Sequence, residues 1–335
     1  MRRDHACLYR ELDSIPVSSS LAVVRVGKLE RAIRLIVRGL KKEIKSLHAL
    51  RFIFGKDANE LRKIQGSCRG RCCLVVGNGP SADSVNWDVV SEAQEIDVYC
   101  VNQFLENRGI DASKISGLLL SDKCSLDIEM ARETNPAIVE RVLRLQEAIA
   151  RYNWPLFVPF EMKKLALGIT GSSDRVKCFS DNTSVLSCSL SPLWPRRHVS
   201  MTVLKLLVLV GYMEYEQILL IGCDNDYTRW LRILPSNEVG NLERHSGSNA
   251  SFLFKSMPLG YETFNGYLSS LIKLNKSWRR FSSKRVLNLD PLSFVDAFEK
   301  IRPGSVYMKI LKKERQEEIR KLYKDLGEDK VIGGN

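Results

Sequence analysis

The sequence predicts an α/β fold with a Rossmann-like, mostly parallel sheet. From about residue 72 onward, short apolar runs of strand length alternate with stretches of helical periodicity. Four of these runs end in small polar clusters, as strands do when their carboxyl ends face a ligand. The length of 335 residues suits two domains, or one large domain with appendages.

Six apolar runs are expected to be strands, because each is short and bounded by turn or charged residues. They are Cys72–Gly77, Ile96–Val101, Gly117–Leu120, Leu156–Val158, Gln217–Gly222 and Arg285–Leu289. Helical patterns are expected over 125–152, 201–211, 267–274 and 296–299. The segment from about 228 to 259 is rich in Asn, Ser, Gly and Arg and has weak periodicity, which is typical of a lid or binding loop.

These patterns divide the chain into five parts. A basic helical extension precedes a Rossmann-like nucleotide-binding domain, into which a lid is inserted on the acceptor side. The α/β domain is completed after the lid and is followed by a basic amphipathic helix. The expected bounds are, in that order, 1–66, 67–227, 228–260, 261–305 and 306–335.

Composition excludes several classes of protein. Hydrophobic residues make up 44% of the chain and charged residues 27%, which is ordinary for a soluble globular protein and too apolar for a disordered one. The most apolar stretch, 203–222, is interrupted by Lys205, Glu214 and Glu216, so no transmembrane span is expected. No apolar signal segment follows the N-terminus, and the nine cysteines are expected to be reduced thiols. A cytoplasmic protein is therefore expected.

The charge balance favours an anionic partner. The chain has 51 basic and 39 acidic residues and a net charge of +12. Basic residues surround apolar residues of helical spacing in two stretches, 21–51 and 306–326. Each stretch predicts a basic amphipathic helix, which either packs one face on the body or attaches to an anionic membrane surface. No nucleic-acid-binding motif is present, so no nucleic-acid partner is expected.

The polar strand ends favour a nucleotide site. Gly77 and Gly79 allow a tight turn and a close ligand approach, and a helix starting near Ser81 would direct N–H groups at a phosphate. This turn is neither the dinucleotide fingerprint nor a P-loop, and alone it would suit an ordinary strand-to-helix connection. Three further polar ends support the site, at Asn102, at Ser121-Asp122 and at 222–227.

Several blocks of sequence resemble one group of transferases. Cys73-Leu-Val-Val-Gly-Asn-Gly-Pro-Ser-Ala is followed about 20 residues later by Val98-Tyr-Cys-Val-Asn-Gln-Phe. Further blocks are Arg197-His-Val-Ser-Met-Thr, Gln217-Ile-Leu-Leu-Ile-Gly-Cys-Asp-Asn-Asp-Tyr and Val286-Leu-Asn-Leu-Asp-Pro. In order and spacing they resemble the bacterial CMP-sialic-acid sialyltransferases (glycosyltransferase family 42) and the related proteins of the motility-accessory-factor type. The likeness runs from residue 72 to about 300, with gaps.

The resemblance implies contacts with the donor nucleotide. It implies that Asn78 and Asn102 contact the cytidine monophosphate part of a CMP-sugar, and that Ser121 or Asp122 reaches the ribose. Ser200 and Thr202, at a helix start, would bind phosphate or base. The expected nucleotide-binding set, which joins these residues to the glycine-rich turn, is Gly77, Asn78, Gly79, Pro80, Ser81, Asn102, Ser121, Asp122, Ser200, Thr202, Gly222 and Asp224.

The resemblance also implies catalytic residues. Arg197 would steady the phosphate, and Tyr227 would donate a hydrogen bond to the departing phosphate. The family's second tyrosine is absent, and Arg229 or Arg232 would substitute for it. A histidine suits the role of general base toward the acceptor hydroxyl. His245, in a segment that resembles the family's His-Ser segment, is the candidate.

Two alternatives for the chemistry of these residues remain open. His198, beside Arg197 at a helix start, is the second candidate for the base. Asp224 and Asp226 form an Asp-x-Asp pair, which in many sugar-nucleotide transferases holds Mg²⁺ or Mn²⁺. The resemblance favours the metal-free reading, so no metal and no cofactor are expected.

The expected function is transfer of a sugar, a nonulosonic acid from a CMP-sugar, to a cell-surface glycan or glycolipid acceptor with inversion at the anomeric carbon. The protein would work in the cytoplasm, peripherally on the inner face of the cell membrane. The alternatives are a metal-dependent sugar-nucleotide transferase, a pyrophosphokinase of the pterin type, whose Gly-x-Gly-Pro-Ser block is similar, and a non-catalytic envelope-assembly protein.

Overall fold

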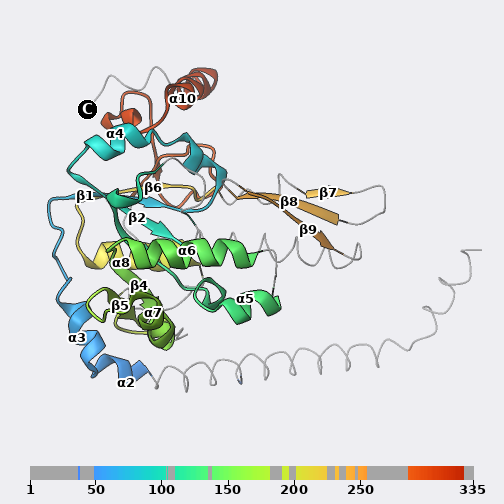
Figure 1. Ribbon diagram of the computed structural model, residues 1–335. Coiled ribbons are helices and arrows are strands. Elements are labelled where there is room, and N and C mark those ends of the chain that lie inside the picture. The colour runs from blue at the N-terminus through green and yellow to red at the C-terminus, as the bar shows by residue number, and fades with distance from the viewer. Residues whose placement is uncertain are drawn as a thin grey trace, which may run out of the picture.

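The computed structural model describes residues 37, 49–102, 104, 110–134, 138–181, 191–195, 201–224, 231–233, 239–245, 248–254 and 286–327. Within these ranges an eight-stranded sheet has the order β11-β10-β6-β1-β2-β3-β4-β5, and all of its pairings are parallel. Figure 1 shows this sheet at the centre of the body. The strands are β1 (Cys72–Val76), β2 (Ile96–Val101), β3 (Ile115–Leu119), β4 (Leu156–Pro159), β5 (Val176–Phe179), β6 (Gln217–Ile221), β10 (Val286–Asn288) and β11 (Glu299–Lys300).

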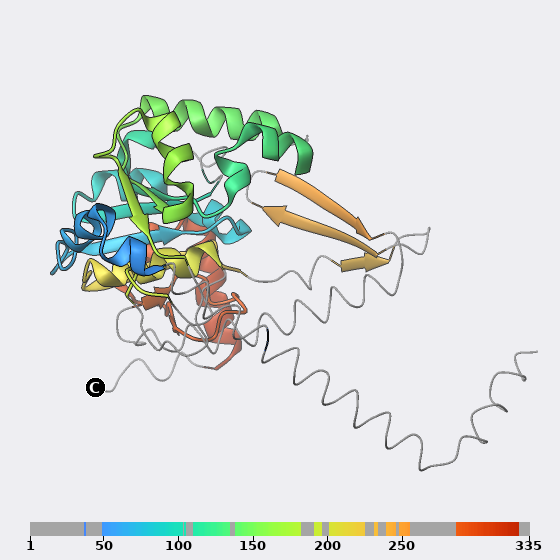
Figure 2. The same ribbon diagram turned by 90° about the horizontal axis from the view of Figure 1, so that it is seen from below.

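Helices lie on both faces of the sheet (Figures 1 and 2). A sheet covered in this way needs strands that are apolar on both sides, and Leu74, Val75 and Val76 of β1 are all fully buried. The α-helices are α2 (Ala49–Ile53), α3 (Lys56–Arg62), α4 (Trp87–Glu92), α5 (Ile128–Thr134), α6 (Val139–Arg151), α7 (Lys163–Thr170), α8 (Thr202–Tyr212) and α10 (Lys313–Asp325). The 3₁₀ helices are η1 (Pro80–Ser84), η3 (Ala112–Lys114), η4 (Lys123–Ser125), η6 (Phe160–Met162) and η8 (Val306–Ile310).

The order in which strands join the sheet reverses at β1, between β1 and β6. The strands β2 to β5 extend the sheet on one side of β1, whereas β6, β10 and β11 extend it on the other. Each of the two central pairings holds five residues in register, with Val76 opposite both Cys100 and Ile221. In an open parallel sheet the crevice at such a reversal, beyond the carboxyl ends of the strands, is where ligands bind.

A second sheet follows β6. It has the antiparallel order β7-β8-β9, with β7 at Leu231–Ile233, β8 at Val239–His245 and β9 at Ser248–Phe254. Both views show these strands standing to one side of the body (Figures 1 and 2). The sequence predicts an irregular lid here, because its polar residues hide the alternation that marks a strand.

The predicted α/β class with a parallel sheet is confirmed, and all six expected strands lie within a residue or two of their expected places. The helix expected over 296–299 is wrong, because the chain there leads into the short edge strand β11. The helix expected over 125–152 is divided into η4, α5 and α6. The helix expected over 267–274 lies outside the described residues.

The two ends of the described chain pack on the body. Phe52, Ala58 and Leu61, from α2 and α3, are buried in the same core as the sheet, although the sequence places them in a separate extension. At the other end, Leu311 and Ile319 are buried as well. The apolar side of the predicted C-terminal helix therefore faces protein, and its basic side chains other than Arg315 stay exposed. Among the described residues, no helix combines the length and the apolar character that crossing a membrane requires.

Candidate functional site

The turns after β1 and β6 lie in direct contact at the carboxyl edge of the sheet. The Gly77 N–H donates to the Ile221 carbonyl at 2.8 Å, and the Gly79 N–H donates to the Gly222 carbonyl at 2.8 Å. Gly222 has a φ of 71°, which favours glycine. A Cβ added to Gly77 would overlap the Gly222 carbonyl, and one added to Gly79 would overlap the Asp224 carboxylate. The glycines thus allow two turns to approach each other.

Ser81 and Asp224 join these two turns. The Ser81 N–H lies 3.3 Å from both carboxylate oxygens of Asp224, and the Gly222 N–H donates to Ser81 Oγ at 3.0 Å. The sequence instead directs the Ser81 N–H at a phosphate. In the structure the Asp224 carboxylate takes that N–H, and η1 is a single short 3₁₀ helix. The role of both residues in nucleotide binding stays a prediction.

A polar cluster forms beyond β2 and β3. The Asn102 Nδ2 donates to Thr202 Oγ1 at 3.2 Å, and the hydroxyls of Ser121 and Thr202 lie 2.8 Å apart. These residues follow β2, follow β3 and begin α8, so three residues expected in the nucleotide site converge from distant parts of the chain. Asn102 has a φ of 50°, a conformation that asparagine tolerates better than most residues. This backbone conformation directs the side-chain amide of Asn102 toward the start of α8.

Two buried amide oxygens lack partners at this edge. Asn78 Oδ1 and Asn102 Oδ1 are both shielded from solvent, and neither accepts a hydrogen bond from the described part of the chain. The two residues follow β1 and β2, which are neighbours in the sheet. Leaving a buried acceptor unsatisfied costs about 1–3 kcal/mol. A ligand with hydroxyl or amino hydrogens would remove this cost, so the pair marks a candidate binding site.

An open cavity of about 430 Å³ lies beside the Ser81–Asp224 contact, and both residues line it. Its walls come from η1, from the turns after β6 and β10, and from the start of α10. Arg315 crosses one wall, with Nη2 2.5 Å from Asp290 Oδ1 and Nη1 2.7 Å from Glu318 Oε2. Burial opposes the charge of Arg315, but its bonds to these two carboxylates raise the pKa of the guanidinium overall. The lining residues are Pro80, Ser81, Asp83, Ser84, Asp224, Asp290, Leu292, Lys312, Glu314, Arg315 and Glu318.

An ion pair with a buried lysine lies at the same edge, and the sequence does not predict it. Lys205 Nζ lies 2.6 Å from Asp181 Oδ2, and the Lys205 side chain is 7% exposed. Asp181 follows β5, and Lys205 lies one turn after Thr202 in α8. A lysine within an otherwise apolar helix was the available signal, but it served only to exclude a membrane span.

The remaining predicted residues are placed in part or not at all. The Asp122 carboxylate accepts a hydrogen bond from the Cys124 N–H at 3.0 Å, which caps η4. His245 is the last residue of β8 and pairs with Ser248 of β9, and Arg232 lies in β7, but only their backbone is described. Arg197, His198, Ser200, Asp226, Tyr227 and Arg229 lie outside the described residues.

In the ranges that the structure describes, no three His, Cys, Asp or Glu side chains lie close enough together to hold a metal ion. Asp224, the first residue of the Asp-x-Asp pair, is engaged with Ser81. Its partner Asp226 lies outside the described part of the chain. The described residues therefore offer one carboxylate of the pair, and that carboxylate supports the turn.

Comparisons with known proteins give a weak structural likeness. A solved structure of a MAf glycosyltransferase from Magnetospirillum magneticum AMB-1 is similar to this chain, with a TM-score of 0.43 and 11% sequence identity. The match covers 80% of this chain and 40% of that protein, so the chain spans less than half of its length. No family model and no curated protein matches the sequence. At this identity and TM-score, no family assignment follows.

Proposed function

We propose that this protein is a glycosyltransferase that takes its sugar from a nucleotide donor, most specifically a CMP-linked nonulosonic acid. The observation that carries the proposal is the pair of unsatisfied amide oxygens of Asn78 and Asn102 at the carboxyl edge of a Rossmann-like sheet. Both oxygens are potential hydrogen-bond acceptors, and a nucleoside offers donors of two kinds, ribose hydroxyls and a base amino group. The sequence resemblance supports the same two residues.

The proposed donor site is the polar cluster around Thr202. The hydroxyls of Ser121 and Thr202 both donate and accept, so they can exchange their mutual hydrogen bond for bonds to ribose or phosphate. Arg197 and Tyr227 are proposed to stabilise the phosphate as it leaves. The acceptor is proposed to be a glycan or glycolipid at an anionic membrane surface, and the open cavity beside Asp224 is its proposed binding place.

The proposed reaction is a single displacement. His245 takes the proton from the acceptor hydroxyl while its oxygen attacks the anomeric carbon, and the bond from that carbon to the phosphate oxygen breaks to release CMP. Because attack and departure occur on opposite faces, the anomeric configuration is inverted. No metal is proposed to take part, and full loss of turnover in EDTA, with recovery in Mn²⁺ or Mg²⁺, would contradict this part of the mechanism.

A thermal-shift screen against CMP, CDP, UDP, GDP and ATP tests the proposed donor. A ligand that binds only the folded chain stabilises it by RT ln(1 + [L]/Kd), which is about 4 kcal/mol at a thousandfold excess over Kd. CMP is expected to give the largest shift. A shift with ATP alone, in the presence of Mg²⁺, would instead favour a kinase-type enzyme, and no shift with any nucleotide would favour a non-catalytic protein.

Four variants separate binding from catalysis. Asn78→Ala and Asn102→Gly should each weaken CMP binding in calorimetry, and glycine at 102 keeps the positive φ that the backbone needs. His245→Ala should leave CMP affinity unchanged and lower turnover by about a hundredfold to ten-thousandfold. If His198→Ala abolishes turnover and His245→Ala does not, the base is at the helix start instead.

A further inference from the structure

The helix α8 carries a charge that its surroundings do not favour. Between Thr202 at its start and Tyr212 at its end its sequence is apolar except for Lys205, and seven consecutive residues from Leu204 to Val210 are buried. Lys205 itself is 6% exposed. A buried ammonium group is costly unless a carboxylate pairs with it, and even a paired lysine and aspartate are often no more stabilising than apolar residues of similar size. Stability alone gives no reason for a lysine at this position.

The ion pair joins the chain just after β5 to the beginning of α8. Asp181 directly precedes residues 182–200, and Lys205 follows that segment by five residues. Residues three apart in a helix lie on the same face, so Lys205 lies on the face of α8 from which Thr202 reaches Asn102 and Ser121. One turn of α8 is thus held twice, by hydroxyl and amide contacts at Thr202 and by the ion pair at Lys205.

We propose that Lys205 and Asp181 form a clasp that positions the first turn of α8 for donor binding. Lys205 is a positioning residue and acts through Thr202, without touching the donor. This inference rests on the proposed function for its readout in nucleotide affinity, and it has a second readout that is independent of it.

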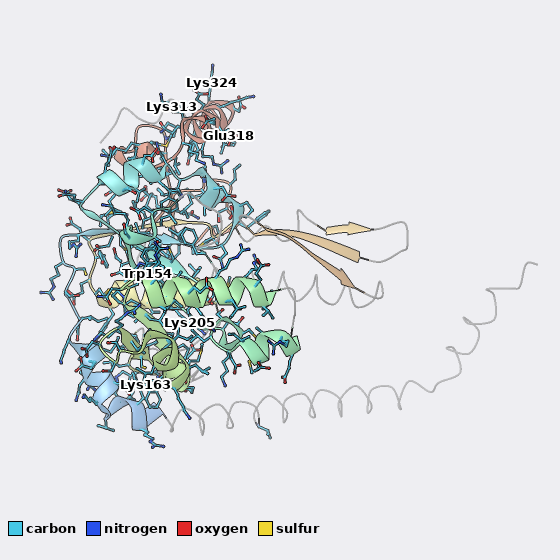
Figure 3. The ribbon with its side chains drawn as sticks, viewed as in Figure 1. Trp154, Lys163, Lys205, Lys313, Glu318 and Lys324 are labelled. Atoms are coloured by element: carbon cyan, nitrogen blue, oxygen red, sulfur yellow. The ribbon has the colours of Figure 1, made fainter. Side chains whose placement is uncertain are left out.

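The chain offers a matched pair as a control. Lys163 Nζ lies 2.6 Å from Asp57 Oδ1, the same separation between the same kinds of group. That pair joins α7 to α3, and neither helix contributes a residue to the polar cluster. Figure 3 labels both lysines, which lie at separate places in the body. Lys163 is more exposed than Lys205, at 34% against 7% of the side chain, so its pair should tolerate substitution at least as well.

The experiment uses the full chain with Lys205→Met, with the double variant Lys205→Met/Asp181→Asn, and with the control Lys163→Met/Asp57→Asn. The single variant leaves the partly buried Asp181 carboxylate without its lysine and should unfold at a lower temperature. The double variant removes both charges and should recover most of the wild-type melting temperature. CMP affinity is measured by calorimetry about 20 °C below the lowest melting point, and amide hydrogen exchange is followed in the first turn of α8.

If the clasp positions α8, the Lys205→Met/Asp181→Asn variant should bind CMP at least tenfold more weakly than wild type even though its melting temperature is largely recovered. Its amide hydrogens at residues 202–205 should also exchange faster. The control double variant should match wild type in both. Wild-type affinity and wild-type exchange in the Lys205→Met/Asp181→Asn variant would overturn the clasp. If wild type itself binds no CMP, the proposed donor is wrong, and exchange at residues 202–205 alone then decides the clasp: faster exchange supports it and unchanged exchange rejects it.

Discussion

At the scale of single residues, the turn after β1 requires glycine at position 79 for one of two reasons, close approach by a ligand or packing against a neighbouring turn. The sequence assigns Gly79 to close approach by a ligand, whereas the structure places its α-carbon against the Asp224 carboxylate. Gly79→Ala should therefore destabilise the folded chain even without ligand, by about 1–3 kcal/mol, since the added methyl group forces two turns apart. Gly168, in the middle of α7, has no atom within 4 Å of an added Cβ. Gly168→Ala should raise stability by about 0.4–1 kcal/mol.

Urea unfolding of both variants measures these effects. If Gly79→Ala unfolds like wild type but binds no CMP, the glycine serves the ligand alone, as the sequence suggests. The role of Gly79 expected from the sequence differs from the one seen in the structure because a sequence shows only which backbone conformations a turn allows. It does not show which neighbour uses the space, and Asp224 lies 145 residues further along the chain.

At the scale of elements, the C-terminal segment illustrates the same limit. Its helical periodicity is visible in the sequence, but an apolar stripe can face lipid or protein. In the structure the N–H of Lys312 donates to the Ser84 carbonyl at 2.8 Å, and Tyr323 Oη donates to the Ile301 carbonyl at 2.9 Å. Ile310→Ala should therefore cost about 2–5 kcal/mol, because its side chain is fully buried. Lys324→Ala, on the exposed side of α10 (Figure 3), should have no measurable effect on the melting temperature.

The amino edge of the sheet holds a buried polar network that is remote from the candidate site. Tyr215 Oη donates to Asp97 Oδ2 at 2.6 Å and lies 2.9 Å from Tyr99 Oη. Burial is the main cause that raises the pKa of both phenols above the ordinary value near 10. Because the folded pKa exceeds the unfolded one, this contribution to stability is complete below about pH 10 and falls as the pH rises, by up to about 1.4 kcal/mol per unit for each phenol.

Unfolding free energies between pH 9 and 12 test this network. The stability of wild type should fall over this interval, and Tyr215→Phe should fall less steeply because it has one phenol fewer to ionise on unfolding. Asp97 keeps Arg71, at 2.6 Å, and Ser116, at 3.3 Å, in that variant. Equal slopes in the two proteins would show that the Tyr215 phenol does not control alkaline stability.

At the scale of the whole molecule, the order of apolar runs is enough to predict a parallel α/β sheet. The polar strand ends predict that the carboxyl edge binds a ligand, and this stays a prediction. Two features were out of reach. The strand β5 (Val-Lys-Cys-Phe) is interrupted by Lys177 and is too short to stand out. The contact of Thr202 with Asn102 and Ser121 depends on how α8 crosses the sheet, and the periodicity of the helix does not specify that crossing.

The net charge of +12 favours attachment to anionic lipid, and we predict that the stretch 21–51 supplies most of the attraction. α10 has five basic and four acidic residues, and its apolar face is covered by the body, so it contributes little attraction. The stretch 21–51 has nine basic and two acidic residues.

Binding to vesicles with anionic headgroups should therefore fall steeply as salt shortens the screening length from about 30 Å at 0.01 M to about 8 Å at 0.15 M. Replacing Arg31, Arg34, Arg38 and Lys41 with Gln should abolish it in a sedimentation assay, whereas replacing Lys313, Lys321 and Lys324 should not. The reverse result would assign attachment to α10, and binding that ignores salt would exclude an electrostatic attachment altogether.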